Sequence, residues 1–174
     1  MNINTKKIVL SGMLTAVAVA LSGFSIPVGA SRCFPAQHLC NVVAAVFLGP
    51  LYGVAMAFCT SLIRNMIGTG SLLAFPGSMI GAFLSGWLYQ HSKKLTAAYI
   101  GEIMGTGIIG GILCYPVATL IMGKEAAVFA YVLPFLMSTV SGTLIAVILV
   151  GALYRSGAFI QLSHMLESGE SSHV

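Results

Sequence analysis

The segment RNMIGTGSLLAFPGS, residues 64–78, lies between two long apolar stretches of the chain. It combines a charged residue and its neighbouring amide (Arg64, Asn65), a Gly-Thr-Gly-Ser loop and a Phe-Pro-Gly break. Irregular backbone at membrane depth persists only where protein or a water-filled cavity satisfies its polar groups. The segment therefore predicts the edge of a small-molecule pocket. On its own it fits an ordinary outer loop with a snorkelling Arg64 equally well.

The composition is that of an integral membrane protein. Of the 174 residues, 57% are hydrophobic and only 7% are charged, and the mean hydropathy is +0.97. A soluble domain needs more polar surface than this to cover its core. We therefore expect one all-α membrane domain over residues 1–174, in the cell membrane and surrounded by lipid bilayer. The net charge of +4 comes with no basic patch interleaved with aromatic residues, so nucleic acid is not an expected partner.

Apolar runs and the breaks between them divide the chain into six predicted transmembrane helices. The expected helices cover residues 8–26, 37–48, 51–66, 75–90, 95–122 and 126–155. Gly49-Pro50 interrupts the second apolar run, because proline removes a helix hydrogen bond and clashes with the preceding turn. That run is therefore two short helices joined by a tight turn, or one kinked helix, which would leave five spans. Residues 161–174 predict a polar, cytoplasmic tail.

The distribution of Lys and Arg favours six spans with both termini in the cytoplasm. With six spans the residues inside are Lys6, Lys7, Lys93, Lys94 and Arg155, and those outside are Arg32, Arg64 and Lys124. With five spans, Lys6, Lys7, Arg64 and Lys124 oppose Arg32, Lys93, Lys94 and Arg155. The difference is small, so charge counting alone leaves five spans open.

No motif for catalysis or nucleotide binding is convincing. Residues 105–110 match GxGxxG, but they lie within a predicted span and lack the preceding strand that a dinucleotide site needs. Small-residue helix packing is the better interpretation of Gly101, Gly105, Gly107 and Gly111. The sequence contains no Walker A motif, no GxSxG elbow and no HExxH motif. We therefore expect no enzymatic activity, no cofactor and no bound metal.

Glu102 is the one acidic residue inside a predicted span. An intramembrane carboxylate is a functional-site hypothesis by default. It lies about two helical turns from the predicted cytoplasmic end, which is close enough to reach Lys93, Lys94 or the interface. We expect this structural role for Glu102.

Polar and aromatic side chains gather on the predicted outer half of the bundle. They begin the second helix, end the third helix and its loop, and occupy the outer parts of the last three helices. Converging amides, donors and aromatic rings beside a glycine-rich loop suit a neutral or weakly polar heterocycle. The candidate substrate-binding residues are Gln37, His38, Asn41, Arg64, Asn65, Thr69, Ser71, Phe75, Tyr115 and Tyr131.

One face of the first helix carries small residues four positions apart, Gly12, Ala16 and Ala20. Small residues at this spacing let another helix approach the backbone closely. They are also common in membrane helices generally, so the pattern alone does not identify a contact.

Four segments of the sequence closely resemble the ThiW family, whose members are substrate-binding S components of energy-coupling factor (ECF) vitamin transporters. The segments are PAQH at 35–38, NV at 41–42, LGPLY at 48–52 and RNMIGTGSLLAFPGSM at 64–79. The resemblance implies a six-helix S-component bundle with cytoplasmic termini and a pocket near the outer face, capped by the first and third loops.

The resemblance also implies a cargo and partners. The cargo is the thiazole moiety of thiamine, hydroxyethylthiazole. The small-residue face of the first helix, with Ala16 and Ala20 extended by Gly12, would dock on the coupling subunit EcfT. Two ECF ATPase subunits would supply the energy, in agreement with the missing Walker A motif. The ring would stack on an aromatic residue such as Phe75 or Tyr115.

Several alternatives remain. One alternative is an S component whose cargo is thiamine or another small heterocycle. The others are a stand-alone secondary transporter, a membrane enzyme and a structural subunit. Thiamine carries a positive charge, and the predicted outer half offers Arg64 but no embedded acid, which disfavours thiamine.

Overall fold

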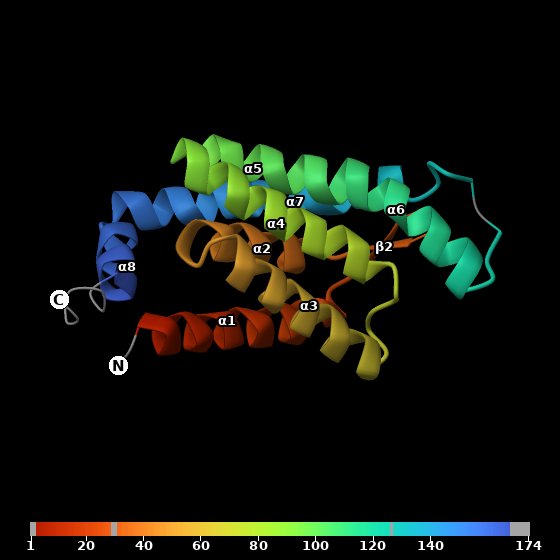
Figure 1. Cartoon of the computed structure of the whole chain (residues 1–174), viewed down its shortest axis with the longest axis horizontal. Coiled ribbons are helices and arrows are strands. Elements are labelled where there is room, and N and C mark those ends of the chain that lie inside the picture. The colour runs from red at the N-terminus through yellow and green to blue at the C-terminus, as the bar shows by residue number, and fades with distance from the viewer. Residues whose placement is uncertain (1–2, 29–30, 126, 168–174) are drawn as a thin grey trace.

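The computed structural model describes residues 3–28, 31–125 and 127–167, and these form a bundle of helices that alternate in direction (Figure 1). The bounds are α1 Ile3–Ala20, followed by the 3-10 turn η1 Leu21–Gly23, α2 Pro35–Phe47, α3 Pro50–Met66, α4 Ala74–Ser92, α7 Val132–Arg155 and α8 Ala158–Glu167. Between α4 and α7 runs one long helix, Leu95–Ile121. It consists of α5 Leu95–Glu102, the π-helical η2 Ile103–Gly110, α6 Gly111–Pro116 and the π-helical η3 Val117–Ile121.

The bundle has two distinct ends. The start of α1, the α4–α5 turn and α8 lie together at one end, which we call the terminal end (Figure 1). The α3–α4 loop, the connection from η3 to α7 and a short β-ribbon lie at the other, which we call the loop end. The ribbon pairs β1 Ile26–Val28 antiparallel with β2 Ser31–Cys33. Apart from this ribbon, the expectation of an all-helical fold is confirmed over the described residues.

The second apolar run forms two helices, as the six-span interpretation requires, and not one kinked helix. Gly49 separates α2 from α3 with a φ of 82°, a conformation that glycine adopts readily and other residues rarely do. Pro50 then begins α3, where its missing N–H has no helical partner to lose. Among the described residues, three helices are long and apolar enough to cross a membrane: Thr5–Gly23, Leu95–Ile121 and Val132–Arg155.

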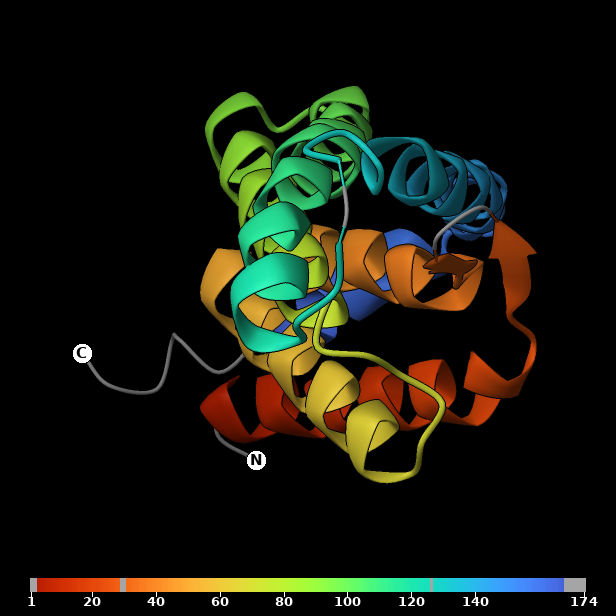
Figure 2. The same ribbon diagram turned by 90° about the vertical axis from the view of Figure 1, so that its right-hand side faces the viewer.

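Helix α2 lies at the centre of the bundle. It packs against α1, α3, α4 and α7, and Figure 2, which faces the loop end, shows it surrounded by the other helices. Val42, Ala44 and Ala45 are completely buried. A short helix that crosses the bundle core is sheltered from lipid by its neighbours, so it needs no long lipid-facing apolar surface of its own.

Helix α4 and the long helix approach each other through glycines. A Cβ on Gly105 would lie 2.8 Å from the Cα of Gly81, and a Cβ on Gly101 would lie 2.7 Å from the Cα of Ser85. Both distances are shorter than side chains tolerate, so only glycine permits this approach. The packing interpretation of the 101–111 glycines is confirmed for this seam.

Two expectations about the ends of helices were wrong. The stretch predicted as a polar tail, residues 161–174, is helical as far as Glu167, where α8 ends, and residues 168–174 lie outside the described part. Phe159, Leu162 and Leu166 fall on one face of α8 and pack on the core, with the Phe159 ring 4.9 Å from that of Phe47. The last long helix begins at Val132, later than the expected 126, and Ala126 lies outside the described residues.

Candidate functional site

A chain of buried polar side chains crosses the middle of the bundle. Helix α2 contributes Gln37, His38 and Asn41, which share one helix face because they are spaced by one, three and four positions. All three are buried, at 3%, 7% and 0% exposed. Their partners come from α3, α4 and the long helix. Burial of a polar group costs free energy unless the group is hydrogen-bonded, so these contacts help to hold the helices together. We call this row of side chains the polar chain.

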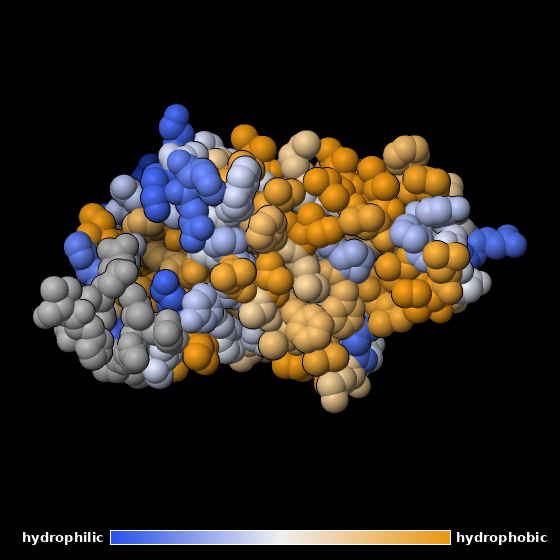
Figure 3. Space-filling view, viewed as in Figure 1, coloured by the Kyte–Doolittle hydropathy of each residue, from blue (hydrophilic) through white to orange (hydrophobic). Residues whose placement is uncertain are grey.

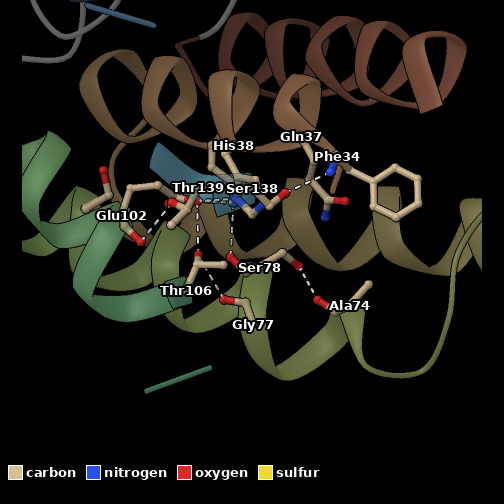
Figure 4. A network of polar contacts seen from close by, with 12 residues as sticks. Phe34, Gln37, His38, Ala74, Gly77, Ser78, Glu102, Thr106, Ser138 and Thr139 are labelled. Atoms are coloured by element: carbon tan, nitrogen blue, oxygen red, sulfur yellow. Dashed lines mark hydrogen bonds and ion pairs between the residues drawn. The ribbon is translucent and has the colours of Figure 1, made fainter. Parts of the chain in front are cut away.

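Glu102 lies at one end of the polar chain (Figure 4). It is completely buried, and its Oε1 lies 2.9 Å from His38 Nδ1 and accepts from Asn41 Nδ2 at 3.0 Å and Thr106 Oγ1 at 3.1 Å. The expectation that Glu102 reaches Lys93, Lys94 or the interface was therefore wrong. The prediction that no embedded acid lies near the candidate pocket was wrong for the same reason, because Glu102 contacts His38. The α-helical register turns Glu102 inward toward α2, which sequence position alone does not reveal.

The Glu102 carboxylate favours one tautomer of His38. In a neutral ring, contact with a carboxylate favours the proton on Nδ1, and Nε2 is then an acceptor. No described residue hydrogen-bonds to Nε2. His38 also lines a small cavity, so it has one free ring nitrogen where a ligand could contact it.

Arg64 lies at the other end of the polar chain. It is only 1% exposed, and its Nη1 donates to Gln37 Oε1. The guanidinium carbon lies 3.6 Å from the centroid of the Phe34 ring. Arg64 is thus directed into the bundle, and the interpretation as a snorkelling surface residue was wrong. Arg64 has no carboxylate partner among the described side chains, since the one carboxylate in the polar chain, Glu102, contacts His38.

Two serines connect the two ends. Gln37 Nε2 donates to Ser61 Oγ at 3.1 Å, and Ser61 Oγ lies 3.0 Å from Ser78 Oγ. Asn41 Nδ2 then donates to the Ser78 carbonyl at 3.3 Å. The polar chain therefore runs without a break from Arg64 to Glu102.

Asn65, Thr69 and Ser71 organise the α3–α4 loop. Asn65 Nδ2 donates to the carbonyls of Ser61 at 2.8 Å and Ser71 at 3.0 Å, which ties the loop back to α3. The Thr69 hydroxyl lies 3.0 Å from that of Ser22, at the end of the first helix. These residues hold the loop over the polar chain and do not line the cavity at His38.

The three aromatic candidates lie away from that cavity. Phe75 pairs with Phe58 at 5.5 Å between ring centroids, and Tyr131 is 3% exposed in a cluster with Leu73 and Cys114. Tyr115 is half-buried on α6. The aromatic rings that line the cavity are Phe34 and Phe135, which sequence reasoning missed.

Two cavities meet at the loop end. The inner one has a volume of about 30 Å³ and is lined by Gln37, His38, Ser78, Ser138 and Phe135, together with Arg32 and Phe34. The outer one has about 190 Å³ and is lined by the 68–71 loop, Leu73, Met122 and Lys124, again with Arg32 and Phe34. The inner cavity has about the volume of one water molecule. Arg32 and Phe34 thus separate a polar inner site from a wider outer vestibule.

The segment that divides the two cavities is tied to α7. The Phe34 backbone N–H donates to Ser138 Oγ at 2.7 Å (Figure 4). Small-molecule pockets usually have about 300–1,000 Å³, so a heterocycle would enter the inner site only with displacement of Phe34. No sequence signal distinguished Ser138 or Phe34, since both are ordinary residues of an apolar chain.

A separate apolar groove lies between α1 and α3. It has a volume of about 570 Å³, and Gly12 and Ala16 line it with Ile8, Tyr52 and Met56. Gly12, Ala16 and Ala20 are all exposed, and a Cβ on Gly12 would meet no atom within 4 Å. Over the described part of the chain, the small-residue face of α1 is therefore not used for packing within the bundle.

Comparison with known proteins gives a consistent result. A model of the family described as "Thiamine-precursor transporter protein (ThiW)" matches residues 8–156. Among solved structures, one described as the S component of a bacterial ECF transporter superposes with a TM-score of 0.72 at 17% identity. The alignment covers 87% of this chain and 97% of that chain. At this identity the similarity shows a shared fold. A search of curated proteins found no match.

Proposed function

Because the chain belongs to the ThiW family of thiamine-precursor transporters and has the fold of an ECF S component, we propose that it binds hydroxyethylthiazole from outside the cell as the S component of an ECF importer. In this role it is a multi-pass protein of the plasma membrane with six spans. The terminal end, with Lys6, Lys7, Lys93, Lys94 and Arg155, faces the cytoplasm, and the loop end faces outward.

The observation that carries the proposal is the inner cavity with aromatic walls and a polar floor. Phe135 offers a face for a flat thiazole ring, Phe34 would pack on the other face after its displacement, and His38 offers Nε2. The hydroxyl of the ligand would donate to His38 Nε2. The ring nitrogen would accept from Gln37, Ser138 or Arg64. This pairs an apolar ring with a few directional polar contacts, which is how small-molecule sites obtain orientation.

Entry would proceed through the outer vestibule. A ligand held by the 68–71 loop, Arg32 and Lys124 would displace Phe34 and reach His38. Asn65 and Thr69 would hold the loop, while Asn41 and Glu102 would hold His38 in the required orientation. In this scheme Asn65, Thr69, Ser71 and Asn41 support the site, and Phe75, Tyr115 and Tyr131 pack around it.

The charges favour a neutral ligand over thiamine. Arg32 and Lys124 line the outer vestibule, and Arg64 lies behind Phe34 without a carboxylate partner among the described residues. Oε1 of Glu102 already has three polar contacts, and this carboxylate lies in the bundle core, at the far end of the polar chain from Arg64. A permanently cationic thiazolium would meet positive potential before it reached this carboxylate.

The groove between α1 and α3 supports the proposed partner. EcfT would dock on Gly12, Ala16 and Ala20, where small residues allow close helix approach. Two ECF ATPases would then drive reorientation of the bundle and release of the cargo. Changing Ala16 to Leu should abolish uptake in cells that contain EcfT and the ATPases, while the purified variant still binds its ligand.

Isothermal titration of the purified protein with hydroxyethylthiazole, and in parallel with thiamine, tests the cargo. We expect binding of the thiazole and much weaker binding of thiamine. The reverse order would keep the S-component function but overturn the cargo, and no binding of either by folded protein would contradict the proposal.

The buried His38–Glu102 pair also suits a stand-alone secondary transporter, in which such a pair would carry a proton. Uptake that persists without any ATPase subunit would favour this second function. Uptake that requires the ATPases would exclude it.

A further inference from the structure

A basic groove opens at the terminal end, at the opposite end of the bundle from the inner and outer cavities. It has a volume of about 610 Å³, and three cations line it with three aromatic rings: Lys93, Lys94, Arg155, Tyr89, Tyr154 and Phe159. An adjoining cavity of about 350 Å³ shares Lys93 and Tyr89 and adds Lys7. Hydrophilic side chains gather at this end of the molecule, in contrast to the apolar middle (Figure 3).

The three cations of this groove have no ion-pair partner among the side chains that the structure describes. Glu102 is completely buried in the bundle core, and Glu125 belongs to the connection at the loop end. Glu167 ends α8 at the terminal end, and its side chain lies outside the described part. Three unpaired cations that line one groove attract an anion.

The backbone at Lys93 is unusual and places this residue between the two cavities. Lys93 ends α4 in a left-handed conformation with φ 56° and ψ 16°, and its N–H donates to the Tyr89 carbonyl at 2.8 Å. It is the one non-glycine residue with positive φ in the described part of the chain. Glycine is the usual residue at such a helix end, so a lysine there costs backbone stability.

The groove continues into an apolar surface along α7. Gly151 lines the groove, and one turn before it on the same helix face lie Val147 and Ile148, which are 41% and 74% exposed. Arg155 lies one turn after Gly151 and also lines the groove. Positive charge and aromatic rings thus adjoin an exposed apolar helix face, the arrangement expected at a membrane interface.

We propose that this groove binds the phosphodiester headgroup of an anionic phospholipid. Lys93, Lys94 and Arg155 would contact the phosphate oxygens, and an acyl chain would lie along Val147 and Ile148 of α7. The apolar continuation favours a lipid over a free phosphate compound, because a phosphate bound in this groove would lie at the edge of a membrane-facing surface, where the acyl chains of the same lipid can lie.

The test is lipid binding to the detergent-purified full chain, measured by native mass spectrometry with phosphatidylglycerol and phosphatidylcholine. We expect a clear preference for phosphatidylglycerol. The double variant Lys93→Gln/Lys94→Gln should weaken phosphatidylglycerol binding by about fivefold for each lysine removed, since each cation near an anionic lipid surface contributes roughly that factor. The matched control Arg32→Gln/Lys124→Gln removes the same charge at the loop end and should retain the preference.

A second variant separates lost binding from lost folding. Lys93→Gly removes one charge but relieves the left-handed backbone, so it should weaken phosphatidylglycerol binding while Tm stays the same or rises. Equal binding of the two lipids, or equal losses in the test and control doubles, would overturn the proposal. Glycerol 3-phosphate that competes at the same concentrations as phosphatidylglycerol would overturn the lipid assignment and identify a soluble anion instead.

Discussion

The polar chain from Arg64 to Glu102 and the glycine seam between α4 and the long helix use opposite means to bring helices together. In the polar chain, side chains from four helices are joined by hydrogen bonds. In the seam, side chains are absent and backbones touch, as at Gly81 and Gly105.

The two regions depend on each other. A Cβ on Gly81 would lie 1.9 Å from Thr106 Oγ1 and 2.9 Å from Glu102 Oε2, so the seam creates the space in which these polar groups lie. Close backbone approach is thus what allows Glu102 to reach His38. A polar site inside this membrane bundle therefore requires small residues where the neighbouring helices touch, as well as the hydrogen-bonding side chains themselves.

The largest effect is expected from Gly105→Ala. The added Cβ would lie 2.8 Å from the Gly81 Cα and 2.9 Å from the Ile80 carbonyl oxygen, and backbone cannot yield as a side chain can. Overpacking of this kind costs about 2–3 kcal/mol, which should lower Tm by roughly 4–12 °C in thermal unfolding in detergent. Gly12→Ala is the matched control, because its Cβ meets nothing within 4 Å. Equal Tm changes in both variants would show that the seam has no special role.

The next effect concerns the polar chain itself. His38→Ala should weaken hydroxyethylthiazole binding by about 2 kcal/mol, or roughly thirtyfold, because it removes a directional buried contact. Titration calorimetry measures the change. His91→Ala, which alters an exposed histidine at the terminal end, should bind like the unmodified protein. Unchanged affinity of the His38 variant would remove this residue from the site.

A smaller effect distinguishes the two sets of aromatic residues. Phe34→Ala should weaken binding of the thiazole by about 1 kcal/mol, roughly fivefold, through loss of ring contact. Phe75→Ala should leave affinity unchanged, because Phe75 pairs with Phe58 and does not line the inner cavity. Affinity that depends on Phe75 and not on Phe34 would restore the assignment made from sequence.

The smallest effect is expected at Thr143. Its hydroxyl is buried without a partner among the described residues, so Thr143→Val should leave stability within about 0.5 kcal/mol or raise it. Thr139→Val makes the same change one turn earlier but removes a 3.3 Å hydrogen bond to the Glu102 carbonyl, and should cost about 1 kcal/mol. A larger loss for Thr143 than for Thr139 would show that the described polar chain is incomplete.

The class of the protein and the division of the chain into helices could be predicted from the amino-acid sequence. Low charge and long apolar runs indicate a membrane bundle. Lipid excludes unpaired polar groups, so each segment that crosses the bilayer must be a continuous apolar run that is visible in the sequence. Gly49-Pro50 marked the turn between α2 and α3, because proline and positive-φ glycine act locally. The polar side chains of α2 were also visible, since isolated amides and histidine contrast with an apolar helix.

Which polar residues contact one another, and which only lie at the same end of the bundle, depends on how the helices pack. Glu102 and His38 are 64 positions apart, and their contact depends on helix rotation and on the glycine seam, neither of which a local pattern specifies. Phe34 and Ser138 became candidates because the first loop folds back on α7, not because of their residue types. The rotation of each helix about its axis depends on packing against all of its neighbours, so it is defined only in the assembled bundle.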